Sequence, residues 1–220
     1  MSAESARGNT RWRWALAAVI VAIAAAVALW PQFTRSDDKS AASGSTTSAG
    51  PVEPAVAESD RAAAALAACP RPTGAPVGDS PLRGIALNCL ADGKPVDLVS
   101  ALAGKPALLN LWAYWCGPCA EELPLLQQFS QQAGSALTVL AVHSDAGTAK
   151  ALSRLTGLGI HLSGVEDPNT KVRTAVGAPA VLPISVLLRA DGTVAKVVVR
   201  PFTSVEDISA TVAAELGVRA

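Results

Sequence analysis

The pattern of apolar and polar positions divides the chain into three unlike regions. An unbroken apolar run covers residues 14–30, and a stretch dominated by Ser, Thr, Gly, Ala and Pro follows over residues 31–68. Because the first run has no polar face, it predicts a membrane segment rather than a helix of a globular domain. The second stretch cannot bury enough apolar surface to order itself, so we expect a flexible linker. Residues 69–220 form the predicted folded domain.

Strands and helices alternate along this third region. Residues 106–114 form a nearly continuous apolar run, which is typical of a central strand buried on both faces. A turn at Ala91–Gly93 joins two short strand patterns, over residues 85–90 and 94–99, into a predicted hairpin. The other expected strands cover residues 136–144, 160–167, 184–189 and 194–200, and the expected helices cover 61–70, 117–132, 148–158, 168–177 and 204–217. Ser204 is the predicted N-cap of the last helix. The pattern indicates an α/β domain with a mixed sheet flanked by helices.

The residues around the first apolar run indicate its orientation. Three arginines precede the run, which favours a cytoplasmic tail over residues 1–13, and three tryptophans lie at its two ends, as interfacial aromatics do. We expect an uncleaved single-pass anchor at 14–30, with the catalytic domain outside the cytoplasm. The alternative is a cleaved signal peptide, since "AVA" at 26–28 resembles a cleavage site. "LAAC" at 66–69 resembles a lipoprotein box, but it does not directly follow the apolar run and is rejected.

Composition narrows the possible functions. The formal net charge is zero, so the chain lacks the basic excess of a nucleic-acid binder, and we expect no nucleic-acid partner. The chain has four cysteines, and an even number fits a compartment in which disulfides form.

Two of these cysteines, Cys116 and Cys119, form a CxxC pair in "LWAYWCGPC". A structural zinc site needs four ligands, usually two such pairs, and the other cysteines and histidines show no ligand spacing. We therefore expect neither a metal nor another cofactor. A redox pair explains the motif better.

The position of the pair, after a buried strand and at the start of a helix, supports redox chemistry. Unpaired N–H groups at a helix N-terminus stabilise a thiolate at Cys116. Cys119, one turn along, can then resolve a mixed disulfide. Gly117 gives a partner room and Pro118 is tolerated in the first turn. Trp115 covers the site and offers a partner an apolar surface.

The motif and its surroundings resemble the thioredoxin superfamily, and more closely its membrane-anchored TlpA/ResA branch, which contains thiol reductases of cytochrome c maturation. The resemblance extends from about Leu82 to the end of the chain. It implies a thioredoxin-like fold with an N-terminal β-hairpin and, over residues 148–167, the extra helix and strand of the branch. Asn110 matches the branch at a position where thioredoxin itself has a buried aspartate. Glu122 matches the active-site glutamate of the branch, and Pro124 matches its helix-kinking proline. The resemblance also implies that Pro183 is cis and that Leu182 offers backbone groups to a partner.

Glu122 also has a role that follows from its spacing. Residues three apart on a helix share a face, so its carboxylate lies on the side of Cys119 and can accept the proton that this thiol must lose. The alternative is a solvated surface residue like Glu121. We expect Trp112 to be a core residue. We expect His143, which ends a strand, to be a surface or hydrogen-bonded histidine without a catalytic role.

The remaining cysteines, Cys69 and Cys89, are expected to form a structural disulfide between the incoming chain and the hairpin. A loop of about twenty residues closed in this way stabilises a fold by about 3 kcal/mol. The alternative is an internal relay in which one of them exchanges with Cys116.

Together these features predict a membrane-anchored thiol–disulfide oxidoreductase that reduces disulfides of partner proteins. The resemblance implies apocytochrome c as the substrate and an integral membrane thiol carrier as the electron donor. The first alternative is an oxidant of folding proteins, although Gly117 and Pro118 supply none of the extra thiolate stabilisation that a strong oxidant needs. The second alternative is a thioredoxin-fold module that binds a partner without catalysing a reaction.

Overall fold

The computed structural model describes residues 56–219 except Thr73 and Pro76. The predicted cytoplasmic tail, the predicted anchor and most of the predicted linker lie outside these residues. Within the described part of the chain, no helix has the length and apolar character needed to cross a membrane.

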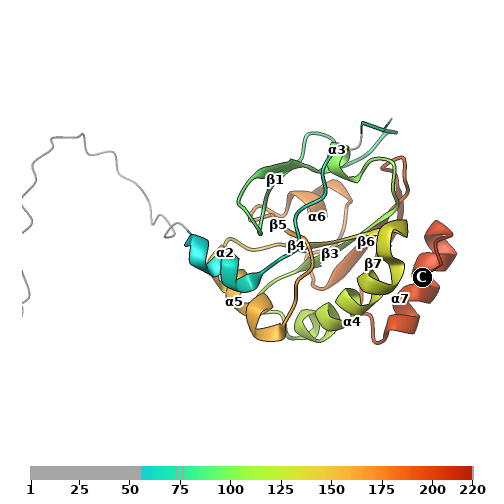
Figure 1. The fold of residues 1–220 in the computed structure, drawn as a ribbon. Coiled ribbons are helices and arrows are strands. Elements are labelled where there is room, and N and C mark those ends of the chain that lie inside the picture. The colour runs from blue at the N-terminus through green and yellow to red at the C-terminus, as the bar shows by residue number, and fades with distance from the viewer. Residues whose placement is uncertain (1–55, 73, 76, 220) are drawn as a thin grey trace, which may run out of the picture. The chain divides into compact units, whose positions relative to one another are not determined.

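A mixed sheet forms the centre of the described domain (Figure 1). Its strand order is β2-β1-β5-β4-β3-β6-β7. The strands are β1 (Ala86–Cys89), β2 (Pro95–Asp97), β3 (Ala107–Trp112), β4 (Thr138–His143), β5 (Gly164–Glu166), β6 (Ile184–Leu188) and β7 (Val194–Val198). Strands β3, β4 and β5 are parallel, whereas the β1–β2 and β6–β7 hairpins extend the sheet with antiparallel pairs at its two edges.

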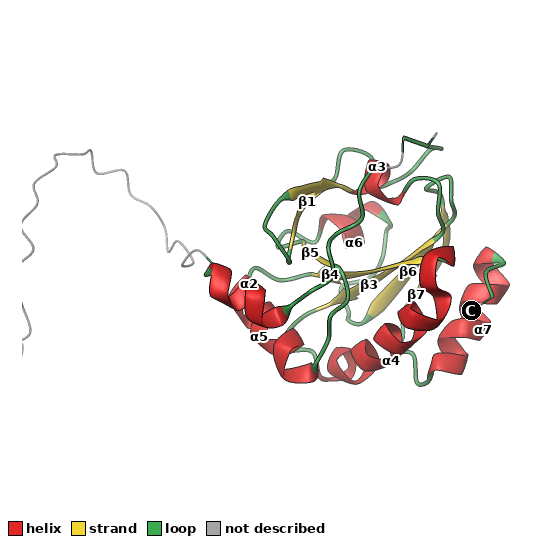
Figure 2. Cartoon of the chain, in the orientation of Figure 1, coloured by secondary structure: helices red, strands yellow, loops and turns green. Residues whose placement is uncertain are grey.

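Helices cover both faces of this sheet (Figure 2). They are α2 (Glu58–Ala64), α3 (Leu98–Leu102), α4 (Gly117–Ala133), α5 (Thr148–Leu158), α6 (Lys171–Ala175) and α7 (Val205–Leu216), with a short 3-10 helix η2 (Gly134–Ala136) after α4. Ser204 caps α7, because its hydroxyl accepts the N–H of Asp207 at 3.1 Å. The predicted mixed sheet, both hairpins and the extra helix and strand at α5 and β5 are confirmed.

Strand β3 separates two hydrophobic cores. Every residue of β3 is buried, and successive side chains point to opposite faces. Leu108 and Trp112 pack with α4, α5 and α7 in one core, whereas Leu109 and Leu111 pack with α3 and α6 in the other. The continuous apolar pattern of residues 106–114 therefore reflects burial on both sides of the sheet.

Two predicted elements have different bounds in the structure: a strand ends earlier than expected, and a helix begins later. Residues 98 and 99, assigned to a strand, begin α3, because the Asp97 carboxylate accepts the N–H of Ser100 at 2.9 Å and caps a helix there. Residues 168–170, assigned to a helix, form a turn before α6. Asp167 organises this turn by accepting the N–H groups of Lys171 at 2.8 Å and Val172 at 2.9 Å.

The folded part begins before Cys69, where the sequence placed the domain boundary. Helix α2 lies in the range assigned to the linker, and its Ala64 is fully buried in the core beneath α5. The Arg61 guanidinium donates to the carbonyl oxygen of Cys89 at 3.3 Å and to that of Leu90. The short helix predicted at 61–70 therefore starts and ends earlier, and it is part of the domain.

Candidate active site

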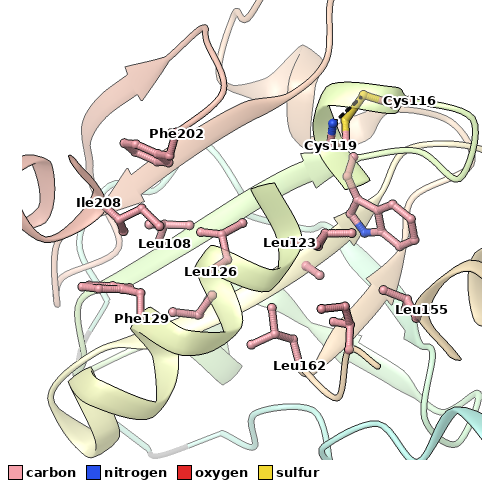
Figure 3. Close-up of a cluster of buried hydrophobic side chains, with 14 of the residues drawn as sticks. Leu108, Cys116, Cys119, Leu123, Leu126, Phe129, Leu155, Leu162, Phe202 and Ile208 are labelled. Carbon is pink, nitrogen blue, oxygen red and sulfur yellow. Dashed lines mark hydrogen bonds between the residues drawn. A yellow bond between two sulfur atoms is a disulfide. The ribbon is translucent and has the colours of Figure 1, made fainter. Parts of the chain in front are cut away.

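The CxxC pair lies where β3 passes into α4. Cys116 is the N-cap of α4, and its sulfur accepts the backbone N–H of Cys119 at 3.3 Å. The two cysteines form a disulfide, with Cys116 5% exposed and Cys119 fully buried. Figure 3 shows this pair at the start of the helix, above the apolar side chains of the core. A helix N-terminus directed at a sulfur stabilises negative charge on that sulfur, which makes Cys116 the expected nucleophile.

Glu122 lies one helical turn beyond Cys119 and is fully buried. Two groups from distant parts of the chain hold its carboxylate. The side-chain amide of Asn110, on β3, donates to one oxygen at 2.8 Å, and the backbone N–H of Phe202 donates to the other at 2.8 Å. The same amide nitrogen of Asn110 lies 3.3 Å from the Ser185 hydroxyl on β6. Asn110 and Ser185 thus link the carboxylate to the central strands, and Glu122 is not the solvated residue that Glu121 is.

This environment raises the pKa of Glu122 to about 6. Burial is the main cause, because it disfavours the charged carboxylate. The hydrogen bonds from Phe202 and Asn110 and the positive charge of Arg200 act in the opposite direction, while Asp207 raises the pKa slightly. A carboxyl group with a pKa near 6 can accept a proton at neutral pH and release it again, as a proton acceptor for a thiol must.

The loop before β6 provides a second wall of the site. The Leu182–Pro183 peptide bond is cis, and Pro183 is buried beside the half-buried Leu182. Val181 is 50% exposed and Trp115 60% exposed, which leaves two large apolar side chains open to a partner. Gly117 and Pro118 are also exposed. The residues expected to contact a partner therefore lie at the surface around Cys116 or line the groove beside it.

A half-buried aspartate in the loop after β4 holds Trp115 in place. Asp145 accepts the indole N–H of Trp115 at 3.0 Å on one oxygen and the N–H of Gly147 at 2.8 Å on the other. Burial alone would raise the pKa of Asp145, but these two hydrogen bonds and the nearby charges hold the pKa below its usual value. The sequence analysis did not identify Asp145. Its only signal was its position just beyond the carboxyl end of a strand parallel to β3.

His143 corrects one expectation. It is fully buried rather than exposed, and its ring lies 5.0 Å from the ring of Trp112 and 6.0 Å from that of Tyr114, centroid to centroid. Neither ring nitrogen has a hydrogen-bond partner among the described residues. Burial lowers the pKa of His143 to about 4, so the ring is neutral at neutral pH. His143 is buried because the parallel register of β3 and β4 places it beside the core residue Trp112.

The second disulfide joins Cys69 to Cys89 and belongs to the opposite core. Cys89, at the end of β1, packs with α3 and α6, and Cys69 lies at the edge of the same cluster. Cys116 and Cys119 belong to the cluster beneath α4. Since the sheet separates the two disulfides, this arrangement favours a structural disulfide over exchange with Cys116. Across the described residues, no three His, Cys, Asp or Glu side chains form a group that could hold a metal ion.

Comparison with known proteins agrees with this geometry. Residues 72–214 match the family model described as Redoxin. The thiol-disulfide oxidoreductase ResA of Bacillus subtilis (strain 168) is 29% identical over 113 residues, which are 51% of this chain and 62% of ResA. The thiol:disulfide interchange protein CycY of Rhizobium leguminosarum bv. viciae is 33% identical over 107 residues, 48% of this chain and 56% of CycY. The chain thus spans about six-tenths of the length of these relatives.

Solved structures place the fold in the same group. A secreted Mycobacterium tuberculosis disulfide oxidoreductase, homologous to E. coli DsbE, has 29% sequence identity and a TM-score of 0.53. That similarity covers 62% of this chain and 99% of the secreted protein. The thioredoxin-like fold and the resemblance to the TlpA/ResA branch are confirmed. Since the family model covers well over half of the sequence, the chain belongs to the Redoxin family.

Proposed function

We propose that this protein is a membrane-anchored thiol–disulfide oxidoreductase that reduces disulfides of partner proteins outside the cytoplasm. One observation carries the proposal. The Cys116 sulfur faces a backbone N–H at the start of α4, and a buried carboxyl group with a pKa of about 6 lies one turn beyond Cys119. This arrangement supplies both a stabilised thiolate and a proton acceptor for the second thiol.

The reaction begins with the reduced Cys116–Cys119 pair. The Cys116 thiolate attacks one sulfur of the partner disulfide, a mixed disulfide forms, and the other partner sulfur leaves as a thiolate. Cys119 gives its proton to the Glu122 carboxylate and attacks the Cys116 sulfur. The second partner thiolate leaves, the partner has gained two electrons, and the protein holds the Cys116–Cys119 disulfide.

Pro183 and Leu182 align the partner in this proposal. A partner strand beside the loop before β6 pairs with the backbone of Leu182, while Trp115 provides an apolar contact. The half-buried Leu182 and the exposed Trp115 and Val181 support this role.

The location and the partners complete the proposal. An anchor at residues 14–30 and a linker between the anchor and α2, shorter than the predicted one because α2 belongs to the domain, hold the domain near the outer face of the membrane. An integral membrane thiol carrier supplies two electrons to regenerate the dithiol. Apocytochrome c, with an oxidised pair of haem-attachment cysteines, is the proposed substrate, as the TlpA/ResA resemblance implies.

The reduction potential of the Cys116–Cys119 pair tests the direction of electron flow. The domain is equilibrated with defined thiol buffers, and the Cys119→Ala variant reports the pKa of the Cys116 thiol. A potential near that of thioredoxin, about −270 mV, is expected for a reductase. A potential near about −120 mV would reverse the proposal and indicate an oxidant of folding proteins. A folded protein that exchanges with no test disulfide would indicate a binding module.

A further inference from the structure

We propose that the groove beside the CxxC pair selects partner segments with an acidic side chain close to the target cysteine, and that Arg173 determines this preference. The inference rests on the proposed function and adds the chemistry of the partner. It comes from Arg173, a residue of this surface to which the proposed reaction gives no role.

The groove lies between the CxxC loop and the loop before β6, and its volume is about 230 Å³. Its walls come from four separate segments of the chain. The residues that line it are Trp115, Ser144, Thr170, Arg173 and the run Ala180–Leu182. Because Trp115 directly precedes Cys116 and Leu182 precedes the cis proline, a partner disulfide that reaches Cys116 brings its flanking residues into this groove.

Most of the groove is uncharged. Trp115 and Val181 contribute exposed apolar surface, and Ser144 and Thr170 contribute hydroxyl groups. These groups can hold an extended segment of almost any sequence, so they provide affinity without much selection. Arg173 is the one charged side chain among the described residues that line the groove.

The guanidinium of Arg173 has unused donors. One nitrogen donates to the Thr170 hydroxyl at 3.2 Å, and no described carboxylate lies within ion-pair distance of the side chain. An arginine has five N–H donors in a planar fork that matches a carboxylate. Since the side chain is half-buried, its charge is less screened than that of a fully exposed arginine. A carboxylate from the partner is the group that best fills this position.

Asp145, the aspartate that holds Trp115, forms no ion pair with Arg173 among the described residues. Both oxygens of Asp145 already accept hydrogen bonds, from the Trp115 indole and from the N–H of Gly147. Asp145 is not among the residues that line the groove. It fixes one wall and leaves the positive charge of Arg173 available to a partner.

The test uses the full chain, reduced at Cys116 and Cys119, with a set of disulfide-bonded peptides. Each peptide carries one Glu, Gln or Lys at one of the three positions on either side of its cysteine. We expect the Glu peptide to react roughly five- to tenfold faster than the Lys peptide at one or two of these positions. The Gln peptide should lie between them, and the difference should shrink at high ionic strength.

Charge reversal sharpens the test. Arg173→Glu should invert the preference, and the milder Arg173→Gln should remove it, which keeps the test informative if the reversal perturbs folding. Arg154→Glu is the matched control, because Arg154 is an exposed arginine on α5 outside the groove, and it should keep the wild-type preference.

Two further outcomes separate this inference from the proposed function. Equal rates for all peptides in the wild-type protein, with every peptide reduced, would overturn the acidic preference and leave the oxidoreductase intact. Failure to reduce either the peptides or a small neutral aromatic disulfide would instead overturn the proposed function.

Discussion

The two disulfides of this domain have the same covalent structure but lie in opposite chemical environments. Cys116 and Cys119 are three residues apart at the start of a helix, whereas Cys69 and Cys89 are twenty residues apart and join the incoming chain to a hairpin strand. The first pair lies in the core beneath α4, and the second in the core on the other face of the sheet.

The largest difference between the two disulfides is the charge of the backbone atom that faces the sulfur. The Cys116 sulfur accepts a backbone N–H at 3.3 Å, so negative charge on it is stabilised. The Cys69 sulfur lies 3.1 Å from the carbonyl oxygen of Gly164, whose partial negative charge disfavours a thiolate. The direction of the neighbouring backbone dipoles thus distinguishes a disulfide suited to exchange from one suited to holding the fold together.

The largest expected effect is on exchange at the first pair. Cys116→Ser should reduce the rate with a small neutral disulfide to the uncatalysed background, because the nucleophilic thiolate is lost. Stopped-flow absorbance of the released thiol measures this rate. Residual activity in the variant would mean that another cysteine acts as the nucleophile.

The second pair should affect stability instead. Replacing both Cys69 and Cys89 by serine should lower the free energy of unfolding by about 3 kcal/mol, because the unfolded chain regains the freedom of the open loop. Urea denaturation, with the CxxC pair kept oxidised in both proteins, measures the difference. The double variant should keep the exchange rate of the wild type, and a loss of exchange without a loss of stability would point to a relay.

Glu122 should affect only the second chemical step, in which Cys119 resolves the mixed disulfide. Glu122→Gln should lengthen the lifetime of the mixed disulfide by about 100-fold at pH 7, because Cys119 loses its proton acceptor. Rapid chemical quenching of the mixed disulfide measures the lifetime. Glu121→Gln, a change at the exposed neighbour, is the control and should leave it unchanged. Equal lifetimes in both variants would remove Glu122 from the mechanism.

The pKa of Glu122 also predicts a pH dependence of stability. The folded pKa of about 6 exceeds the ordinary value of 4.5, so Glu122 contributes stability below about pH 4.5 that is lost as the pH rises through 6. Relative to Glu122→Gln, the wild type should therefore lose about 2 kcal/mol between pH 4.5 and 7.5. Urea denaturation of both proteins across this range provides the measurement, and parallel curves would contradict the raised pKa.

The smallest expected effect is a loss of stability from a substitution far from both disulfides in the sequence. Ser204→Ala removes the N-cap of α7 and should cost about 1 kcal/mol of stability. The same urea assay measures this change. Exchange at Cys116 should stay within twofold of the wild type, and a larger loss would show that α7 positions the site through Phe202.

Much of the fold and the site could be predicted because the evidence is local. The buried strand at 106–114, the helix after the cysteines and the capping Ser204 follow from patterns of a few residues. The CxxC spacing at a strand–helix junction indicates redox chemistry for the same reason. The sequence pattern does not predict α3, because a cap at Asp97 overrides a strand-like run. It also places α2 too late along the chain, and the Arg61 contacts that join α2 to the domain reach residues almost thirty positions away.

The sequence by itself determined the order of elements, the redox pair and the candidate proton acceptor, because these depend on spacing along one strand or one helix. Only the tertiary structure decided the environment of each group. It buried Glu122 between Asn110 and the Phe202 N–H, enclosed His143 without a hydrogen-bond partner among the described residues, and placed Arg173 in the groove beside Cys116. Burial, pKa and charge pairing depend on which distant segments pack together, and a spacing pattern does not contain that information.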